Sequence, residues 1–184
     1  RLNPDSPTRY PLYWEEKVRT WSQRDYPLTI RGGSIFGWLR NWMGLEQISM
    51  TVYDDPAFFD EMVTTVADCI LAVLEKTLAS GVQFDACGMW EDMAYNAGPL
   101  LNPRHFKKYL VPHYRRIADL CHRYGVDVIW LDCDGKIDRF IDLHDVKRAL
   151  PLHELQPGQD YILGVWEDEL DVEYVRMYGL DRGG

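Results

Sequence analysis

The sequence lacks the features that mark several large classes of protein. It has no basic run, and its 20 Lys and Arg against 29 Asp and Glu give a net charge of −9, which argues against a nucleic-acid partner. It has no apolar stretch long enough to span a membrane, and its polar opening predicts no signal peptide. Its four cysteines show no Cys-x-x-Cys spacing, which is typical of a cytoplasmic protein rather than a disulfide scaffold.

The composition, 46% hydrophobic and 27% charged over 184 residues, predicts one globular domain, residues 1–184, with one core. Apolar patterns of strand length alternate along the chain with helical patterns. We predict strands at 26–30, 83–87 and 126–131, and helices at 35–43, from Asp55 to Gly81, and at 103–124. This alternation is typical of an α/β protein with a parallel sheet, in which the loops after all three strands emerge at one end.

Two acidic clusters follow these strands. Glu91 and Asp92, flanked by Trp90 and Tyr95, are either a solvated loop or a pair that performs acid/base chemistry or orients a ligand. The two aromatic side chains favour a site, because they would partly exclude water and could line a pocket for a flat substrate.

The second cluster is Asp132-Cys-Asp134, at the end of the third predicted strand. Strand alternation places Asp132 and Asp134 on one face and Cys133 on the other. The acids either cap the next helix or lie at the mouth of the site, with Cys133 as a further substrate-binding candidate. Oxygen ligands suit Mg, Mn or Ca better than zinc, so the identity of any metal stays open.

Arg31-Gly-Gly-Ser34 is predicted to form a turn before the helix at 35–43. Ser34 is a good N-cap for that helix. The N–H groups of Gly32 and Gly33, exposed at a helix start, together with the charge of Arg31, could bind a substrate anion. A simple tight turn explains the same residues equally well. No histidine pair has metal-ligand spacing, and neither a nucleophile elbow nor a phosphate-binding loop is present.

Short motifs in a fixed order extend over residues 24–143. They include Arg24-Asp-Tyr-Pro-Leu28, Gly33-Ser-Ile-Phe-Gly-Trp-Leu-Arg-Asn-Trp-Met-Gly44, Trp90-Glu-Asp-Met-Ala-Tyr95 and Asp132-Cys-Asp-Gly135. Each is weak alone, but together the chain resembles the uroporphyrinogen decarboxylase (URO-D) superfamily. The resemblance implies a (β/α)8 TIM barrel with its active site at the strand ends.

The resemblance leaves two reactions open. Heme-pathway decarboxylases of the superfamily act on tetrapyrroles without a cofactor, whereas its methyltransferases pass a methyl group between a methylated small molecule and a corrinoid on a partner protein. We expect methyl transfer or a closely related decarboxylation, with a genuine uroporphyrinogen decarboxylase as the alternative. In either case the residues expected to position or protonate the reacting group are Glu91, Asp92, Asp132 and Asp134. Asp132 and Asp134 replace the zinc-binding His-x-Cys pair of the methyltransferases, which argues against zinc.

A full barrel takes about 250 residues, so this chain is predicted to hold only part of one. Residues 144–184 diverge from the superfamily pattern; there we predict a strand at 161–166 and a helix at 171–178, after a weak helix at 137–150. Open sheet edges would favour pairing with another chain, as in a homodimer. A catalytically incomplete fragment, acting only as a binding or oligomerising module, is therefore the second functional hypothesis.

Overall fold

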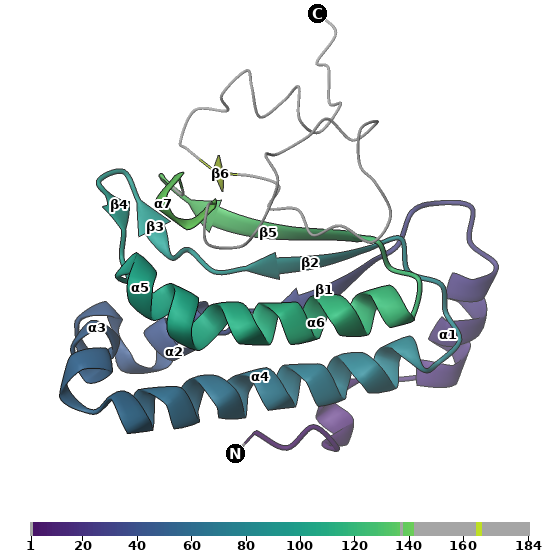
Figure 1. The fold of residues 1–184 in the computed structure, drawn as a ribbon. Coiled ribbons are helices and arrows are strands. Elements are labelled where there is room, and N and C mark those ends of the chain that lie inside the picture. Colours follow the sequence, from purple (N-terminus) through teal and green to yellow (C-terminus); the bar gives the residue numbers. More distant parts are fainter. Residues whose placement is uncertain (1, 137, 142–164, 167–184) are drawn as a thin grey trace, which may run out of the picture.

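A parallel β-sheet is the centre of the computed structural model, which describes residues 2–136, 138–141 and 165–166 (Figure 1). Its four strands lie side by side in chain order: β1 (Thr29–Gly33), β2 (Ala86–Trp90), β5 (Val128–Asp134) and β6 (Val165–Trp166). In register, Ile30 lies beside Cys87, and Cys87 lies beside Ile129. Because the strands are parallel, their carboxyl ends meet at one end of the sheet, as predicted.

Helices precede and connect these strands. Ahead of β1 are a 3-10 turn, η1 (Pro7–Arg9), and α1 (Trp14–Ser22); between β1 and β2 are α2 (Phe36–Met43), α3 (Leu45–Asp54) and α4 (Pro56–Leu78). β2 leads through a small antiparallel pair, β3 (Ala94–Tyr95) and β4 (Gly98–Pro99), to α5 (Pro103–His105), a π-helical turn η2 (Phe106–Leu110) and α6 (Val111–Arg123). After β5 comes α7 (Asp138–Ile141).

The two long helices, α4 and α6, lie against each other and on the same face of the sheet (Figure 1). Successive parallel strands with their helices on one face are the arrangement of a barrel, whereas a doubly wound sheet has helices on both faces. Within the described ranges β1 has a strand neighbour on one side only, and the sheet does not close. The α/β class is confirmed, and the part of the chain that the structure describes is an open sheet.

The two faces of the sheet differ in composition. Toward the helices, alternate strand residues are buried and apolar: Ile30, Cys87, Met89, Ile129, Leu131 and Cys133. On the opposite face the intervening residues are half-buried or exposed: Arg31, Trp90, Trp130, Asp132 and Asp134. This second face therefore carries four of the predicted site residues, Arg31, Trp90, Asp132 and Asp134.

The helix α4 forms where local signals predict it. The Asp55 side chain caps it by accepting a hydrogen bond of 3.0 Å from the Phe58 N–H, and Pro56 occupies the first turn. After its end, Gly81 adopts a φ of 84°, a left-handed conformation that glycine tolerates best. Capping, periodicity and termination thus agree, and the prediction is confirmed.

The helical run over 103–123 departs from the single predicted helix. Asn102 caps its start with a bond of 2.9 Å from the Arg104 N–H, as expected. The π-helical turn over 106–110 then interrupts it, immediately before Val111 and Pro112. Proline has no N–H and its ring clashes with the preceding turn, so a widened turn there relieves that clash.

All three predicted strands are shifted: each begins two or three residues later than predicted. Before β1 and β2, the Asp85 carboxylate accepts hydrogen bonds of 2.7 Å from the Leu28 N–H and from Arg24. These bonds between distant segments hold residues 26–28 outside the ladder. As a consequence Arg31 and Gly33 lie within β1, and the prediction of a turn at 31–34 is wrong.

Sequence reasoning did not predict α3, which follows a break at Gly44 with a φ of 85°. It buries Ile48, Thr51 and Val52. Of the predictions for 144–184, only Val165–Trp166 falls in the described residues, where it is a strand beside Cys133 and Asp134. The predicted helix at 171–178 and most of that at 137–150 lie outside them. In the described part of the chain, no helix is long and apolar enough to cross a membrane.

Candidate active site at the carboxyl ends of the strands

The ends of β2 and β5 bring the two predicted acidic clusters together. Trp90 lies beside Asp132 in the sheet register, and the Glu91 N–H donates a hydrogen bond of 2.9 Å to the Asp132 carbonyl. Asp92 lies close enough to raise the pKa of Asp132 through its charge. The structure therefore brings the two clusters side by side, and Asp132 and Asp134 lie inside β5 rather than beyond it.

Glu91 is fully buried, and both of its carboxylate oxygens are engaged. One accepts from the Ile35 N–H at 2.7 Å; the other accepts from the Gly37 N–H and the Ser34 hydroxyl, each at 3.0 Å. Burial raises the pKa of Glu91, and the donors, with the Tyr114 hydroxyl of α6, oppose that rise. With its acceptor sites taken by the protein, Glu91 has the geometry of a positioning residue that joins β2 to the start of α2.

This arrangement also changes the roles predicted for Ser34 and for the anion site. Ser34 does not cap α2: its hydroxyl bonds Glu91, and Ile35 is the N-cap, with no side-chain capping bond. The Ile35 and Gly37 N–H groups at the start of α2 face the protein's own carboxylate. The turn expected at Arg31–Ser34 is not formed, because Arg31, Gly32 and Gly33 belong to β1.

Asp92 is tied to α2 by Arg40. The guanidinium donates to the Asp92 carboxylate at 3.0 Å and to its carbonyl oxygen at 2.7 Å, with both side chains largely buried. Asp92 has a φ of 41°, a conformation that aspartate tolerates better than most residues. The ion pair holds this strained residue in place and partly offsets its charge, so Arg40 is a site residue that the sequence did not reveal.

Asp132 differs from both. It is half-buried, and within the described residues its Oδ1 atom is buried without a hydrogen-bond partner. Burial raises the pKa of Asp132 to about 6, and the charges of Asp92 and Asp134 act in the same direction. A carboxyl with a pKa close to neutral and an unused oxygen is suited to give and take protons.

Cys133 and Asp134 confirm the predicted alternation along β5. Cys133 is buried on the helix-facing side, and its thiol donates weakly to the Asp134 carbonyl at 3.7 Å. Burial raises the pKa of Cys133 to about 12, so the group stays a neutral thiol. Its position does not fit the substrate contact that we predicted, whereas the exposed Asp134 remains on the face of Asp132.

Two indoles cover the same face of the sheet. Trp90 packs over the start of α2, where a Cβ atom on Gly37 would lie 2.6 Å from its ring, and it meets Trp38 edge-on at 5.3 Å between centroids. Trp130 lies across Gly88, where a Cβ atom would be 2.4 Å from its ring. Trp130 was missed, although its spacing of two from Asp132 predicts the same face.

The remaining predicted residues lie toward the margins. Tyr95 is 59% exposed on β3, with its backbone against Gly135 and its carbonyl accepting a 3.2 Å bond from the Lys136 N–H. Arg31 lies on β1 beside Gly88, which separates it from Trp130 and β5. Arg31 is thus separated from β5 by the width of one strand, and its role as an anion contact stays a prediction.

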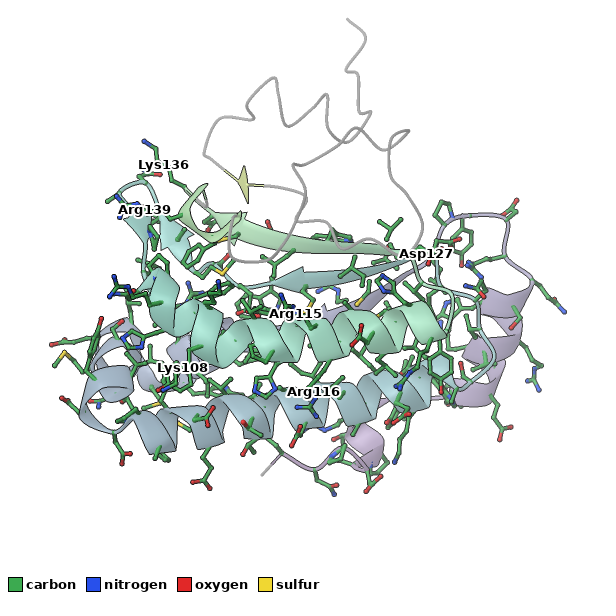
Figure 2. All side chains as sticks on the ribbon, viewed as in Figure 1. Lys108, Arg115, Arg116, Asp127, Lys136 and Arg139 are labelled. Atoms are coloured by element: carbon green, nitrogen blue, oxygen red, sulfur yellow. The ribbon has the colours of Figure 1, made fainter. Side chains whose placement is uncertain are left out.

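Cationic side chains that the prediction overlooked lie at the carboxyl end of β5. Figure 2 shows Lys136 and Arg139 at that end and Asp127 at the opposite end of the strand. Both cations are exposed. They add positive charge at the end of the strand that carries Asp132 and Asp134.

The donor set does not fit the zinc site of the superfamily's methyltransferases. Where those enzymes carry His and Cys, Asp132 and Asp134 offer oxygen atoms, and Cys133 faces the helices. In residues 2–136, 138–141 and 165–166 no group of three His, Cys, Asp or Glu side chains is arranged to hold a metal ion.

Three known relatives match between 31% and 70% of this chain. A biosynthetic arginine decarboxylase of Nostoc sp. is 63% identical over 57 residues, which is 31% of this chain and 8% of that protein. That of Thermosynechococcus vestitus is 60% identical over 57 residues, with 31% and 9% covered. That of Pseudomonas putida is 22% identical over 160 residues, with 70% and 25% covered. The chain thus spans a quarter or less of the length of these relatives.

A family model matches most of the chain. The uroporphyrinogen decarboxylase (URO-D) model covers residues 16–145, well over half of the sequence. This range contains β1, β2 and β5 and every predicted site residue. The chain therefore belongs to the uroporphyrinogen decarboxylase family.

Proposed function

We propose that this chain carries the proton-transfer site of a decarboxylase, with Asp132 as the acid. The observation that supports this most directly is the half-buried Asp132 carboxyl, which has a pKa of about 6 and one oxygen without a partner among the described residues. Both the matching family and the similar relatives are named as decarboxylases. The substrate would be a carboxylic acid, either a small molecule or a tetrapyrrole.

The chemistry requires one proton. Decarboxylation breaks the bond between the substrate carboxylate and its neighbouring carbon; CO₂ leaves, and the electron pair stays on that carbon, which must then be protonated. With a pKa of about 6, roughly a tenth of Asp132 is protonated at pH 7, and it can regain a proton from water after each turnover. An ordinary aspartate would be protonated about a hundredfold less often.

The neighbouring residues would have supporting roles. Glu91 and Arg40 fix the end of β2, Trp90 and Trp130 exclude water, and Asp92 and Asp134 keep Asp132 from ionising too readily. Lys136 and Arg139 are proposed contacts for the substrate carboxylate, since they lie at the same end of β5 (Figure 2). These assignments replace Arg31 and Cys133 in the predicted substrate-binding set.

Methyl transfer to a corrinoid partner is less well supported by this geometry. Superfamily members of that kind activate a thiol with zinc bound to His and Cys, and the corresponding positions here are Asp132 and Asp134. The one cysteine beside them has a pKa of about 12 and faces the helices. We therefore place decarboxylation ahead of methyl transfer.

The test is CO₂ release from uroporphyrinogen and from L-arginine by the purified chain, with methyl transfer to cob(I)alamin measured in parallel. We expect CO₂ release that falls at least about 100-fold in Asp132→Asn. Asp127→Asn, a half-buried aspartate at the opposite end of β5, is the matched control and should retain activity (Figure 2). Methyl transfer without CO₂ release, or an active Asp132→Asn variant, would refute the proposal.

A module without catalysis is the second candidate, favoured by the single strand neighbour of β1 in the described residues. Circular dichroism and analytical ultracentrifugation discriminate between the two. A module that pairs through its open edge should sediment as a dimer or larger and melt at a temperature that rises with concentration. A monomer with one cooperative, concentration-independent melt would argue against it.

A further inference from the structure

A cavity of about 360 Å³ lies beside the edge strand β1, away from Asp132. Its walls come from the N-terminal segment, β1, α2 and α4. The lining residues that matter below are Arg9, Arg31, Trp38, Trp42, Ile70 and Val73. Its volume falls within the range of small-molecule sites, roughly 300–1,000 Å³.

Most of the wall is apolar. Ile70 and Val73 of α4 form one side. Trp38 and Trp42 of α2 form another, with their rings stacked at 5.8 Å between centroids. These indoles are 39% and 54% exposed, which is high for the largest apolar side chain. Such a surface favours a ligand with an apolar body.

The protein's own N-terminal segment closes the far side of the cavity. Leu2 lines it and packs against the core, and an ion pair between Asp5 and Lys76 ties the segment to α4. The N-terminal segment therefore contributes to the walls of a partly open cavity. Its size therefore suits a small molecule better than an added strand.

The polar part of the lining is cationic. Among the described residues, Arg9 and Arg31 line the cavity and no acidic side chain does. In the same part of the chain the Arg31 side chain makes no hydrogen bond or ion pair, and the Arg9 side chain bonds only the Asn3 carbonyl, through Nε. Two guanidinium groups without carboxylate partners, in a protein of net charge −9, indicate selection for an anion.

We propose that this cavity binds an amphiphilic monocarboxylate. Its apolar body packs against Ile70, Val73 and the indole of Trp42, and its carboxylate bonds Arg31 and Arg9. Binding is non-covalent. The site is separate from the Asp132 carboxyl, so it does not depend on the proposed decarboxylation.

Octanoate is a suitable probe, with octanol as the neutral match and acetate as the anion without an apolar body. Trp38 and Trp42 line the cavity, so intrinsic tryptophan fluorescence reports binding, and calorimetry gives the affinity independently. We expect octanoate to bind at least about tenfold more tightly than either probe. Arg31→Gln and Arg9→Gln should each weaken octanoate about tenfold and leave octanol unchanged.

Arg123→Gln, at an exposed arginine outside the cavity, is the charge-matched control and should bind octanoate normally. Filling the cavity with Val73→Trp should abolish binding, and the two glutamine variants keep the test valid if that protein does not fold. The proposal is overturned if octanol binds as tightly as octanoate, if the glutamine variants match Arg123→Gln, or if octanoate does not bind. An inactive enzyme that still binds octanoate would refute the proposed function and leave this site intact.

Discussion

The carboxyl ends of β2 and β5 carry acidic side chains in opposite states. Glu91, after β2, is fully buried, and its oxygens accept bonds from Ser34, Ile35 and Gly37. Asp132, on β5, is half-buried and has one buried oxygen without a partner in the described residues. Burial raises the pKa of both, but only Glu91 has donors that offset the cost of its charge.

This difference separates a residue that holds the site from one that is available for chemistry. A carboxylate whose oxygens all accept hydrogen bonds stabilises the segments that supply the donors. Its removal leaves those donors buried without a hydrogen-bond partner. A carboxylate without donors destabilises the fold when charged and is free to exchange protons. The following changes test that distinction, from the largest expected effect to the smallest.

Glu91→Ala should produce the largest loss of stability. It leaves the N–H groups of Ile35 and Gly37 and the Ser34 hydroxyl unpaired in the core, so the free energy of unfolding should fall by about 3–5 kcal/mol. Urea unfolding measures this. Glu91→Gln keeps one acceptor oxygen and should cost less, and a loss below about 1 kcal/mol for alanine would contradict the positioning role.

Gly135→Ala should lower the free energy of unfolding by about 2–3 kcal/mol. The reason is that Gly135 packs the end of β5 against the β3 hairpin, where a side chain does not fit. Gly135 has a φ of 86°, and an added Cβ would lie 2.4 Å from the Tyr95 carbonyl carbon. Gly81→Ala is the matched control, since its φ is 84° but nothing lies within 4 Å. If thermal unfolding shows the same loss of stability for both variants, the contact with Tyr95 does not contribute to the destabilisation by Gly135→Ala.

Asp132→Asn should act in the opposite direction from Glu91→Ala. The pKa of Asp132 is raised to about 6 in the folded protein, above its ordinary unfolded value, so the folded state binds more protons between the two values. Stability from this group is complete below the unfolded pKa and is lost as the pH rises through about 6. Allowing for solvent screening, the substitution should stabilise the protein by about 1 kcal/mol at pH 7.5.

Urea unfolding at pH 4 and pH 7.5 checks this sign. The gain from Asp132→Asn should be present at pH 7.5 and should shrink at pH 4, where the aspartate is largely protonated. Asp127→Asn serves again as the control at the other end of β5. A variant that is destabilised at pH 7.5 would show that Asp132 has partners that the described residues do not include.

Arg40→Gln should have the smallest effect, a rise of about 0.3 in the pH at which Asp132 titrates. Arg40 partly offsets the charge of Asp92, which is one of the charges that raises the pKa of Asp132. Carbon-detected NMR titration of the Asp132 carboxyl measures the change. Arg123→Gln, which lies outside this cluster, should leave the titration unchanged, and a fall in the pKa in Arg40→Gln would contradict the coupling.

Local chemistry explains which parts of the fold could be predicted. The bounds of α4 depend on Asp55, Pro56 and Gly81, all adjacent to the helix, and they were predicted correctly. The starts of β1 and β2 depend on Asp85 reaching Leu28 and Arg24, which are distant in sequence, and these were misplaced. The turn predicted at 31–34 failed for a similar reason, since residues 31–33 pair with β2, which is distant in sequence.

The sequence by itself determined the α/β class, the family motifs and the acidic character of the two strand ends, because composition, periodicity and motif order are properties of the chain alone. Only the tertiary structure decided which of the two acids has hydrogen-bond donors for its carboxylate oxygens. Both clusters consist of acidic residues beside aromatic ones, and no local pattern distinguishes Glu91 from Asp132. The distinction arises because α2 brings its N–H groups to Glu91 and leaves Asp132 without a donor among the described residues.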